Sequence, residues 1–260
     1  MNQKMISQYL LAISFFLTCI ACNQDEKKED EKKVDSSSTA VKEATPPAPQ
    51  EVSIDATTNA PNLYKLMSDS LGIRVLEATY KPGDSSVMHS HPDNAFYVIA
   101  GGKGEFIDKD GKKMEIDLKT GMSNINSYQL HSVKNIGKTT MRVLLVEVNR
   151  PKVIVSPDPA TDATKVAGNN YKLVKDSLGI RIIEVNYKPG QVSALHSHPD
   201  YAVYVVEGGS ATLTDKDGKK NANVVKTGAA WINGADAHSG KNTGGKSFKL
   251  ILVEVNRPRK

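Results

Sequence analysis

The sequence predicts an all-β protein built from two tandem copies of a small barrel or sandwich. Residues 65–151 align without a gap on residues 172–258, and about half of the aligned positions are identical. Each copy is about 100 residues long, a usual size for one globular domain. Strand-like runs separated by turns fill both copies, and neither copy contains a long amphipathic helix pattern. The chain is therefore expected to hold a duplicated β domain.

The expected strands of the first copy follow one another at short intervals. Residues 73–80 form an apolar, strand-like run that ends at a Lys-Pro-Gly turn, and residues 95–99 form a second run that ends at two glycines. Residues 108–111 have the sequence Asp-Lys-Asp-Gly, which is typical of a tight hairpin turn because Asp-Gly tolerates positive φ. Residues 141–148 predict a long apolar strand. The second copy repeats each element, including the hairpin turn at residues 215–218.

The amino-terminal part of the chain is expected to lie outside the barrels. Residues 1–21 combine Lys4 with a short apolar run, a pattern typical of a secretory signal and short for a membrane span. Ala21 directly before Cys22 resembles the lipobox of bacterial lipoproteins, which implies a lipid on Cys22; an ordinary cleaved signal and an uncleaved anchor are the alternatives. Residues 22–54 are rich in charged residues, serine and proline, and predict a disordered tether.

These patterns predict the domain boundaries and the location of the protein. The barrels are expected at residues 55–151 and 162–260, joined by a linker at residues 152–161, because the similarity of the copies extends back to an Asp-Ala-Thr sequence. A lipid anchor would place the protein in the bacterial cell envelope, on its periplasmic or surface face. The two barrels are expected to pack as a pseudo-dimer.

Charge and cysteine content exclude some functions. The formal net charge is +5, and basic and acidic residues are interleaved without a basic stripe that carries aromatic side chains. This pattern argues against nucleic-acid binding. Both cysteines lie in the leader, so the barrels can hold neither a disulfide nor a thiolate metal ligand.

The histidines carry the strongest functional signal. All six fall into two sets with identical spacing: His89, His91 and His131 in the first copy, and His196, His198 and His238 in the second. A His-x-His pair on a strand places both imidazoles on one face, because side chains alternate with period two. The third histidine must come from another strand, and inward-facing side chains converge in a barrel. Three imidazoles with open positions for water or substrate predict a reactive metal site in each copy.

The motifs around these histidines resemble those of the cupin family. Each copy carries Gly-x5-His-x-His-x3-Ala-x6-Gly and then Gly…His-x3-Asn, beginning at Gly83 and Gly121 in the first copy and at Gly190 and Gly228 in the second. The resemblance implies a bicupin of two double-stranded β-helix (jelly-roll) barrels, with a divalent metal ion held by the histidines.

The family also uses a glutamate ligand, whose position is occupied here by Ala95 and Ala202. Three neutral imidazoles leave the charge of the ion uncompensated, which favours an anionic small-molecule ligand. Imidazole ligands do not choose between Fe, Mn, Ni, Cu and Zn.

Further residues are candidates for contact with the ligand: Tyr97, Tyr204, Asn126, Asn233 and Trp231. The two tyrosines are expected to face the barrel interior or to fill the core, and the two asparagines to cap a turn or to line the pocket. Trp231 aligns with Asn124, and Tyr201 aligns with Asn94. The two pockets are therefore expected to bind different ligands, or only one of them to be active.

Several charged residues have alternative roles. Asp93 and Asp200 directly follow the first motif and are either turn residues or substitute carboxylate ligands. Asp236 is placed two residues before His238 and is a candidate to orient its imidazole. Arg74 and Arg181 are expected to pair with a glutamate, either Glu77 and Glu184 or Glu147 and Glu254.

Two classes of function fit this sequence. The first is a metal-dependent enzyme, a non-haem Fe(II) dioxygenase or a related lyase or isomerase, that acts on a small anionic metabolite; no general base is identifiable. The second is a non-catalytic module that captures a small ligand or a metal ion at the cell envelope.

Overall fold

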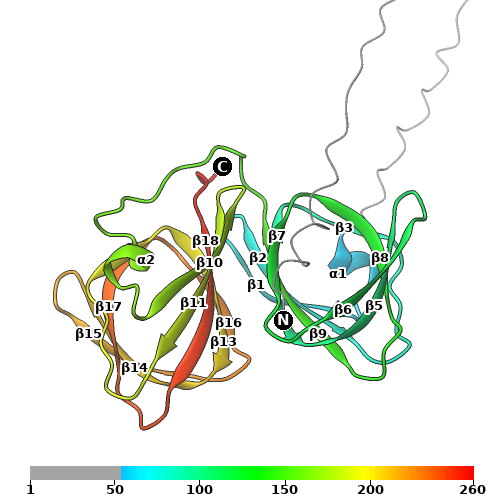
Figure 1. Cartoon of the computed structure of the whole chain (residues 1–260). Helices are drawn as coiled ribbons and strands as arrows, with labels where there is room; N and C mark the ends of the chain where they lie inside the picture. The colour runs from blue at the N-terminus through cyan, green and yellow to red at the C-terminus, as the bar shows by residue number, and fades with distance from the viewer. Residues whose placement is uncertain (1–53) are drawn as a thin grey trace, which may run out of the picture. The chain divides into compact units, whose positions relative to one another are not determined.

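The structure is a computed structural model that describes residues 54–260. The expected signal sequence, the lipidation site at Cys22 and almost all of the expected tether lie outside the described residues. Within residues 54–260, no helix has both the length and the hydropathy that a membrane span requires. The described part consists almost entirely of strands (Figure 1).

The first copy forms one barrel from two antiparallel sheets. Its elements are α1 (Ala56–Asn59), β1 (Tyr64–Ser70), β2 (Ile73–Tyr80), β3 (His89–His91), β4 (Asn94–Ala100), β5 (Gly102–Asp108), β6 (Lys113–Leu118), β7 (Ser123–Asn126), β8 (Gln129–Asn135) and β9 (Met141–Val148). One sheet has five strands in the order β1-β2-β9-β4-β7, and the other has four in the order β3-β8-β5-β6. The predicted strands at residues 73–80 and 141–148 coincide with β2 and β9.

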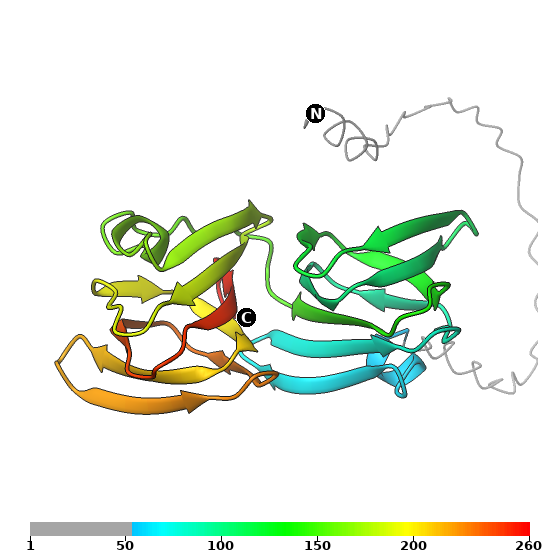
Figure 2. The ribbon, with the colours of Figure 1, turned by 60° about the horizontal axis from the view of Figure 1, so that its bottom comes forward.

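The second copy repeats this topology. Its elements are α2 (Ala163–Val166), β10 (Tyr171–Ser177), β11 (Ile180–Tyr187), β12 (His196–His198), β13 (Asp200–Glu207), β14 (Gly209–Asp215), β15 (Lys220–Val225), β16 (Ala230–Asn233), β17 (Asp236–Asn242) and β18 (Phe248–Val255). The sheet orders are β10-β11-β18-β13-β16 and β12-β17-β14-β15. Figure 2 shows that the strands of each copy wrap around their own interior. The prediction of two tandem jelly-roll barrels is confirmed.

The hairpin between β5 and β6 has the conformation that its sequence predicts. Gly111 has a φ of 79°, in the left-handed region that favours glycine. The carboxylate of Asp108 accepts hydrogen bonds from the backbone N–H groups of Asp110 and Lys112, both at 2.9 Å. The matching residues of the second copy make the same turn, with Gly218 at a φ of 81°.

Residues of the two five-stranded sheets alternate between a barrel lumen and one core that both barrels share. The shared core is formed by residues from both copies: Ile73, Val75, Ala95, Tyr97, Ile125, Leu144, Val146, Val148, Ile180, Ile182, Ala202, Tyr204, Ile251, Val253 and Val255. Because strands alternate with period two, the neighbours of these residues, such as Phe96 and Val203, face the lumen instead. The two barrels therefore pack against each other through apolar side chains, as a pseudo-dimer would.

Tyr97 and Tyr204 belong to this shared core, and both are buried. The prediction that they face the barrel interior and contact a ligand is therefore wrong. Each tyrosine follows a lumen-facing residue by one position, so its side chain points to the opposite face of the sheet. Filling the core, the alternative interpretation of the sequence, describes their place.

Reciprocal ion pairs reinforce the contact between the barrels. Arg150 Nη2 lies 2.6 Å from Asp200 Oδ2, and Arg257 Nη2 lies 2.7 Å from Asp93 Oδ2. Arg150 also donates a hydrogen bond to the carbonyl oxygen of Arg257 at 2.9 Å. Asp93 and Asp200, which follow the His-x-His strands, thus join their own copy to the carboxyl-terminal arginine of the other, and they are not substitute metal ligands.

Candidate metal centre

The two sets of histidines meet inside the barrels, as the sequence predicts. His89 on β3 is directly opposite His131 on β8, and His196 on β12 is opposite His238 on β17. In each barrel, one nitrogen from each of the three histidines can be chosen so that all three lie within 4.8 Å of one another. Strand alternation brings the second histidine of each His-x-His pair to the same face. Each barrel therefore contains one cluster of three imidazoles.

Hydrogen bonds fix the orientation of the imidazoles. His89 Nδ1 lies 2.8 Å from the carbonyl oxygen of Val87, and His196 Nδ1 lies 2.7 Å from that of Ala194. A carbonyl oxygen only accepts, so Nδ1 carries the proton in both rings and Nε2 carries the lone pair. Within residues 54–260, the Nε2 atoms of His91, His196 and His198 are buried and have no hydrogen-bond partner. Buried polar atoms without a partner are rare, and a bound cation would satisfy these three.

Burial also keeps the imidazoles neutral. Removal from water lowers the pKa of His89 to about 4, of His131 to about 3 and of His196 to about 4. Neutral imidazole is the form that binds metal ions, because its lone pair is free. The clusters therefore present metal-binding lone pairs at neutral pH.

A buried carboxylate orients one histidine in each barrel. Glu147 Oε1 lies 2.7 Å from His91 Nδ1, and Glu254 Oε1 lies 2.7 Å from His198 Nδ1. Carboxylate–histidine pairs of this kind accompany metal-binding histidines, because the carboxylate fixes the ring and makes its other nitrogen more basic. The sequence predicted these glutamates only as alternative partners of the two arginines. The alternation of β9 could have revealed their role, since Glu147 follows the lumen-facing Leu145 by two positions.

An arginine, which is itself paired with an aspartate, contacts each of these glutamates. Arg181 Nη1 lies 2.8 Å from Glu254 Oε2, and Arg181 Nη2 lies 3.0 Å from Asp162 Oδ2. In the first barrel the matching Arg74 lies 3.4 Å from Glu147 and 2.5 Å from Asp55. The expected ion pair between these arginines and Glu147 or Glu254 is therefore present. It fixes the glutamate that in turn orients a histidine of the cluster.

The residues at the position of the family's glutamate ligand are not the two alanines that the sequence predicted. Ala95 and Ala202 point into the shared core, not toward the histidines. The lumen-facing residues that follow them are Phe96 and Val203. Neither Phe96 nor Val203 can bind a metal ion, so the position of the family's glutamate ligand carries no carboxylate in either copy.

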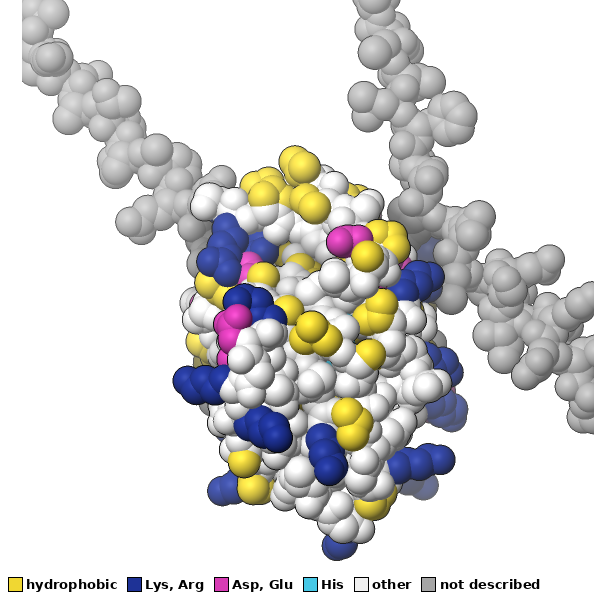
Figure 3. All heavy atoms as spheres, turned by 90° about the vertical axis from the view of Figure 1, so that its left-hand side faces the viewer, with side chains coloured by type: hydrophobic (Ala, Val, Ile, Leu, Met, Phe, Trp, Pro, Cys, Tyr) yellow, Lys and Arg dark blue, Asp and Glu magenta, His cyan; other side chains and the backbone are white. Residues whose placement is uncertain are grey.

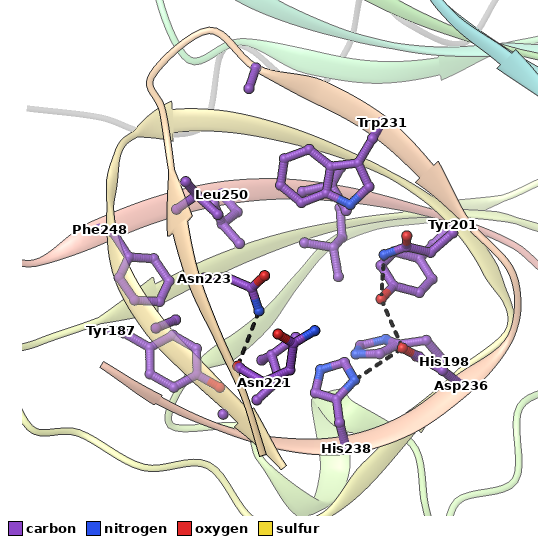
Figure 4. Close-up of a pocket in the computed structure, with 18 of the residues that line it drawn as sticks. Tyr187, His198, Tyr201, Asn221, Asn223, Trp231, Asp236, His238, Phe248 and Leu250 are labelled. Carbon is purple, nitrogen blue, oxygen red and sulfur yellow. Dashed lines mark hydrogen bonds and ion pairs between the residues drawn. The ribbon is translucent and has the colours of Figure 1, made fainter. Parts of the chain in front are cut away.

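The second barrel contains a large cavity beside its histidines. The cavity has a volume of about 700 Å³ and is lined by polar and aromatic side chains that include Tyr171, Tyr187, His198, Tyr201, Asn221, Asn223, Trp231, Asn233, Asp236, His238 and Phe248. Figure 4 shows Trp231 and Tyr201 pointing into the same space as His198 and His238. Two of the residues predicted to contact a ligand, Trp231 and Asn233, thus line this cavity.

A small hydrogen-bond network connects this cavity to the third histidine. Asp236 Oδ2 lies 3.3 Å from His238 Nδ1, and the hydroxyl of Tyr201 donates to the same oxygen at 3.3 Å. Asn233 donates to the Tyr201 hydroxyl at 2.9 Å. Burial opposes ionisation of Asp236, but its hydrogen bond with His238 helps to bring the carboxyl pKa below its ordinary value. Asp236 therefore contacts His238, the arrangement that the sequence predicted.

Apolar side chains fill the corresponding region of the first barrel. Phe96, Phe106 and Ile116 replace Val203, Leu213 and Asn223 of the second copy, and they pack against the core around the lumen. The ring of Phe106 lies edge-on to His131, with 5.9 Å between the ring centroids. Asn126, another predicted ligand contact, is hydrogen-bonded to Gln129 at 3.4 Å; its contact with a ligand stays a prediction. The two lumens have diverged although the histidines are the same.

These features define a protein with two tandem jelly-roll barrels and a histidine cluster in each. Residues 76–147 match the family model of the Cupin domain. The chain is similar to the solved structure of AerE from Microcystis aeruginosa, with a TM-score of 0.53 and 14% identity over 71% of this chain and 88% of that chain. It is also similar to a variant of oxalate decarboxylase from Bacillus subtilis, with a TM-score of 0.52 and 15% identity over 73% of this chain and 70% of that chain. No curated protein matches the sequence. At these identities the solved structures show the fold alone.

Proposed function

We propose that this protein binds a divalent metal ion in each histidine cluster and binds a small molecule beside the metal of the second barrel. The observation that carries the proposal is the set of buried, unpartnered Nε2 atoms of His196 and His198 next to a cavity of about 700 Å³. A cavity of this size holds a small organic ligand. When bound, the ion would act as a Lewis acid and would orient oxygen donors of the ligand.

The charges around the second barrel favour an anionic ligand. Three neutral imidazoles leave the charge of a divalent ion uncompensated, and Lys226 and Lys241 are among the residues that line the cavity. Figure 3 shows the side of the molecule formed by the second barrel, where lysine and arginine side chains are spread over the surface with few acidic ones among them. A surface of this kind attracts anions and raises their local concentration.

The reaction that fits this site best is dioxygenase-like chemistry on a small anionic metabolite. The carboxylate of Asp236 lies on the cavity wall beside His238, and its side chain is 42% exposed. It supplies the general base that the sequence did not reveal, because an ionised carboxylate in contact with the cavity can accept a proton from a bound ligand.

The alternative is a non-catalytic module that binds metal without turnover. The apolar lumen of the first barrel favours this alternative for that barrel, because Phe96 and Phe106 stand where the smaller Val203 and Leu213 line the cavity of the second barrel. We also propose, from the lipobox-like sequence at Cys22 alone, that a lipid anchors the protein to the bacterial cell envelope.

Metal analysis of the purified full-length chain tests the proposal. We expect two divalent ions per chain, with the loss of one in His89→Ala and the loss of the other in His196→Ala. Oxygen uptake with a panel of small acids, diketones and thiols then separates the two functions. Two ions without turnover of any compound would favour the binding module. A chain that binds no metal and is indifferent to both substitutions would refute metal binding altogether.

A further inference from the structure

We propose that the first barrel closes its metal site with a fourth ligand, the phenol oxygen of Tyr64, whereas the site of the second barrel stays open to its cavity. This inference rests on the proposed metal binding and assigns a different role to each barrel. Structural metal sites have all positions filled by protein ligands, and reactive sites keep at least one position open.

The position of the Tyr64 hydroxyl is the first observation. Tyr64 Oη lies 2.8 Å from His89 Nε2. The Nδ1 atom of His89 donates to Val87, so Nε2 holds the lone pair, and the hydroxyl of Tyr64 donates to it. This is the lone pair that a metal ion would use. Two ligands about 2.1 Å from an ion lie about 3.0 Å apart when they meet at a right angle, so the 2.8 Å between the phenol oxygen and Nε2 is a separation at which both atoms can bind one ion.

The surroundings of Tyr64 hold it there. Its side chain is buried, with 5% of the residue exposed, and its hydroxyl accepts a hydrogen bond from Tyr80 at 3.0 Å. Its ring contacts both histidines of the first motif, with 4.9 Å to the centroid of His89 and 5.5 Å to that of His91. An ion that enters the cluster therefore meets the oxygen of Tyr64. The phenol would release its proton to solvent as the oxygen binds the ion, with no change in oxidation state.

The second barrel lacks this closure although its tyrosine is retained. Tyr171 occupies the place of Tyr64, but His196 Nε2 has no hydrogen-bond partner within the described residues. The hydroxyl of Tyr171 accepts from Tyr187 at 3.3 Å, and the ring of Tyr171 lines the cavity. The ring of Tyr171 still lies 4.4 Å from that of His196, measured between centroids, but its hydroxyl is not hydrogen-bonded to His196 Nε2, and His198 and His238 of this cluster line the cavity.

Copper loading gives a readout that does not depend on catalysis. Cu²⁺ is the tightest-binding divalent ion of the first transition row, and a phenolate ligand on Cu²⁺ produces a visible charge-transfer band. We expect this band in His196→Ala, in which only the first site is intact, and not in His89→Ala, in which only the second is intact. Tyr64→Phe should abolish the band in the first site without preventing copper binding. Tyr97→Phe, in the shared core, is the matched control and should keep the band.

Azide tests the second half of the proposal. It should change the electron paramagnetic resonance spectrum of copper in the second site, where a position is open, and leave that of the first site unchanged. A band that survives Tyr64→Phe, copper in the first site without any band, or an azide response of the first site would each overturn the assignment. Failure of both sites to take up copper would instead refute the proposed metal binding, so the two failures are distinguishable.

Discussion

The buried glutamate behind each cluster gives the sharpest prediction: Glu254→Gln should weaken metal binding in the second barrel without unfolding it. Glu254 Oε1 lies 2.7 Å from His198 Nδ1, and both side chains are almost fully buried. Glutamine keeps the shape but loses the negative charge, and its single carbonyl oxygen can accept from His198 or from Arg181 but not from both. The substitution therefore removes the charge-assisted hydrogen bond that the carboxylate makes to the metal-binding imidazole.

The expected magnitude follows from the kind of hydrogen bond that is lost. A hydrogen bond to a charged group contributes about 1.5–3 kcal/mol and a neutral one about 0.5–1.5 kcal/mol. The exchange therefore removes about 1–1.5 kcal/mol, which is about a fivefold to tenfold loss of metal affinity. The fold should survive, because Arg181 keeps its ion pair with Asp162 at 3.0 Å.

Competition between the protein and a coloured zinc chelator measures this affinity. The assay uses His89→Ala as background, so that only the second site binds zinc. Glu184→Gln is the matched control, because Glu184 pairs with Lys249 at 2.7 Å on the surface and does not contact a histidine. If Glu254→Gln and Glu184→Gln bind zinc equally well, the carboxylate does not tune the site and this reasoning fails.

Three further predictions test other parts of the structure. Burial lowers the pKa of His196 to about 4, so the metal-free protein should lose stability as the pH falls from 6.5 toward 4, because the unfolded chain takes up protons first. Urea unfolding at several pH values measures this, and equal stability at pH 7 and pH 5 would contradict it. The double substitution Val203→Phe and Leu213→Phe should introduce into the second lumen the side chains of the first, and abolish ligand binding while zinc still binds. Calorimetry measures the binding of zinc and of the ligand to this variant, and undiminished ligand binding would place the ligand elsewhere. Arg150→Ala removes one buried partner of Asp200, which keeps its pair with Arg259, and should cost about 1.5–3 kcal/mol, which lowers the melting temperature by about 3–12 °C; a shift below about 2 °C would show that the pair is energetically silent.

The fold and the ligand-bearing residues could be predicted because both are local or repeated signals. Period-two alternation and Asp-Gly turns gave the strands, and the duplication revealed that the histidines were kept together. The spacing of His-x-His requires both rings to share one face of a strand, and this requirement does not depend on the rest of the fold. Histidine clusters in both barrels therefore followed from spacing alone.

The supporting residues could not be predicted, because their roles depend on contacts between distant strands. Glu147 lies 56 positions after His91 in the sequence, and only the pairing of β9 with its neighbours brings them together. Tyr97 was misplaced by one position in the alternation, which moves a side chain from the lumen to the shared core. The ion pairs of Asp93 and Asp200 join different copies, so no pattern within one copy reveals them.

The two lumens differ around the same set of histidines, and this difference indicates that the two barrels have different roles. Both copies keep the three histidines and the carboxylate that orients one of them, so both retain the proposed cation site. Around this constant centre, apolar side chains such as Phe106 replace those that leave a cavity in the second copy. A lumen lined by large apolar side chains is a poor site for an anionic substrate, but a metal ion that crosslinks its strands would still stabilise the barrel. Because the barrels share one core, metal binding in the first would stabilise the surface on which the second is built, and only the second needs room for a ligand.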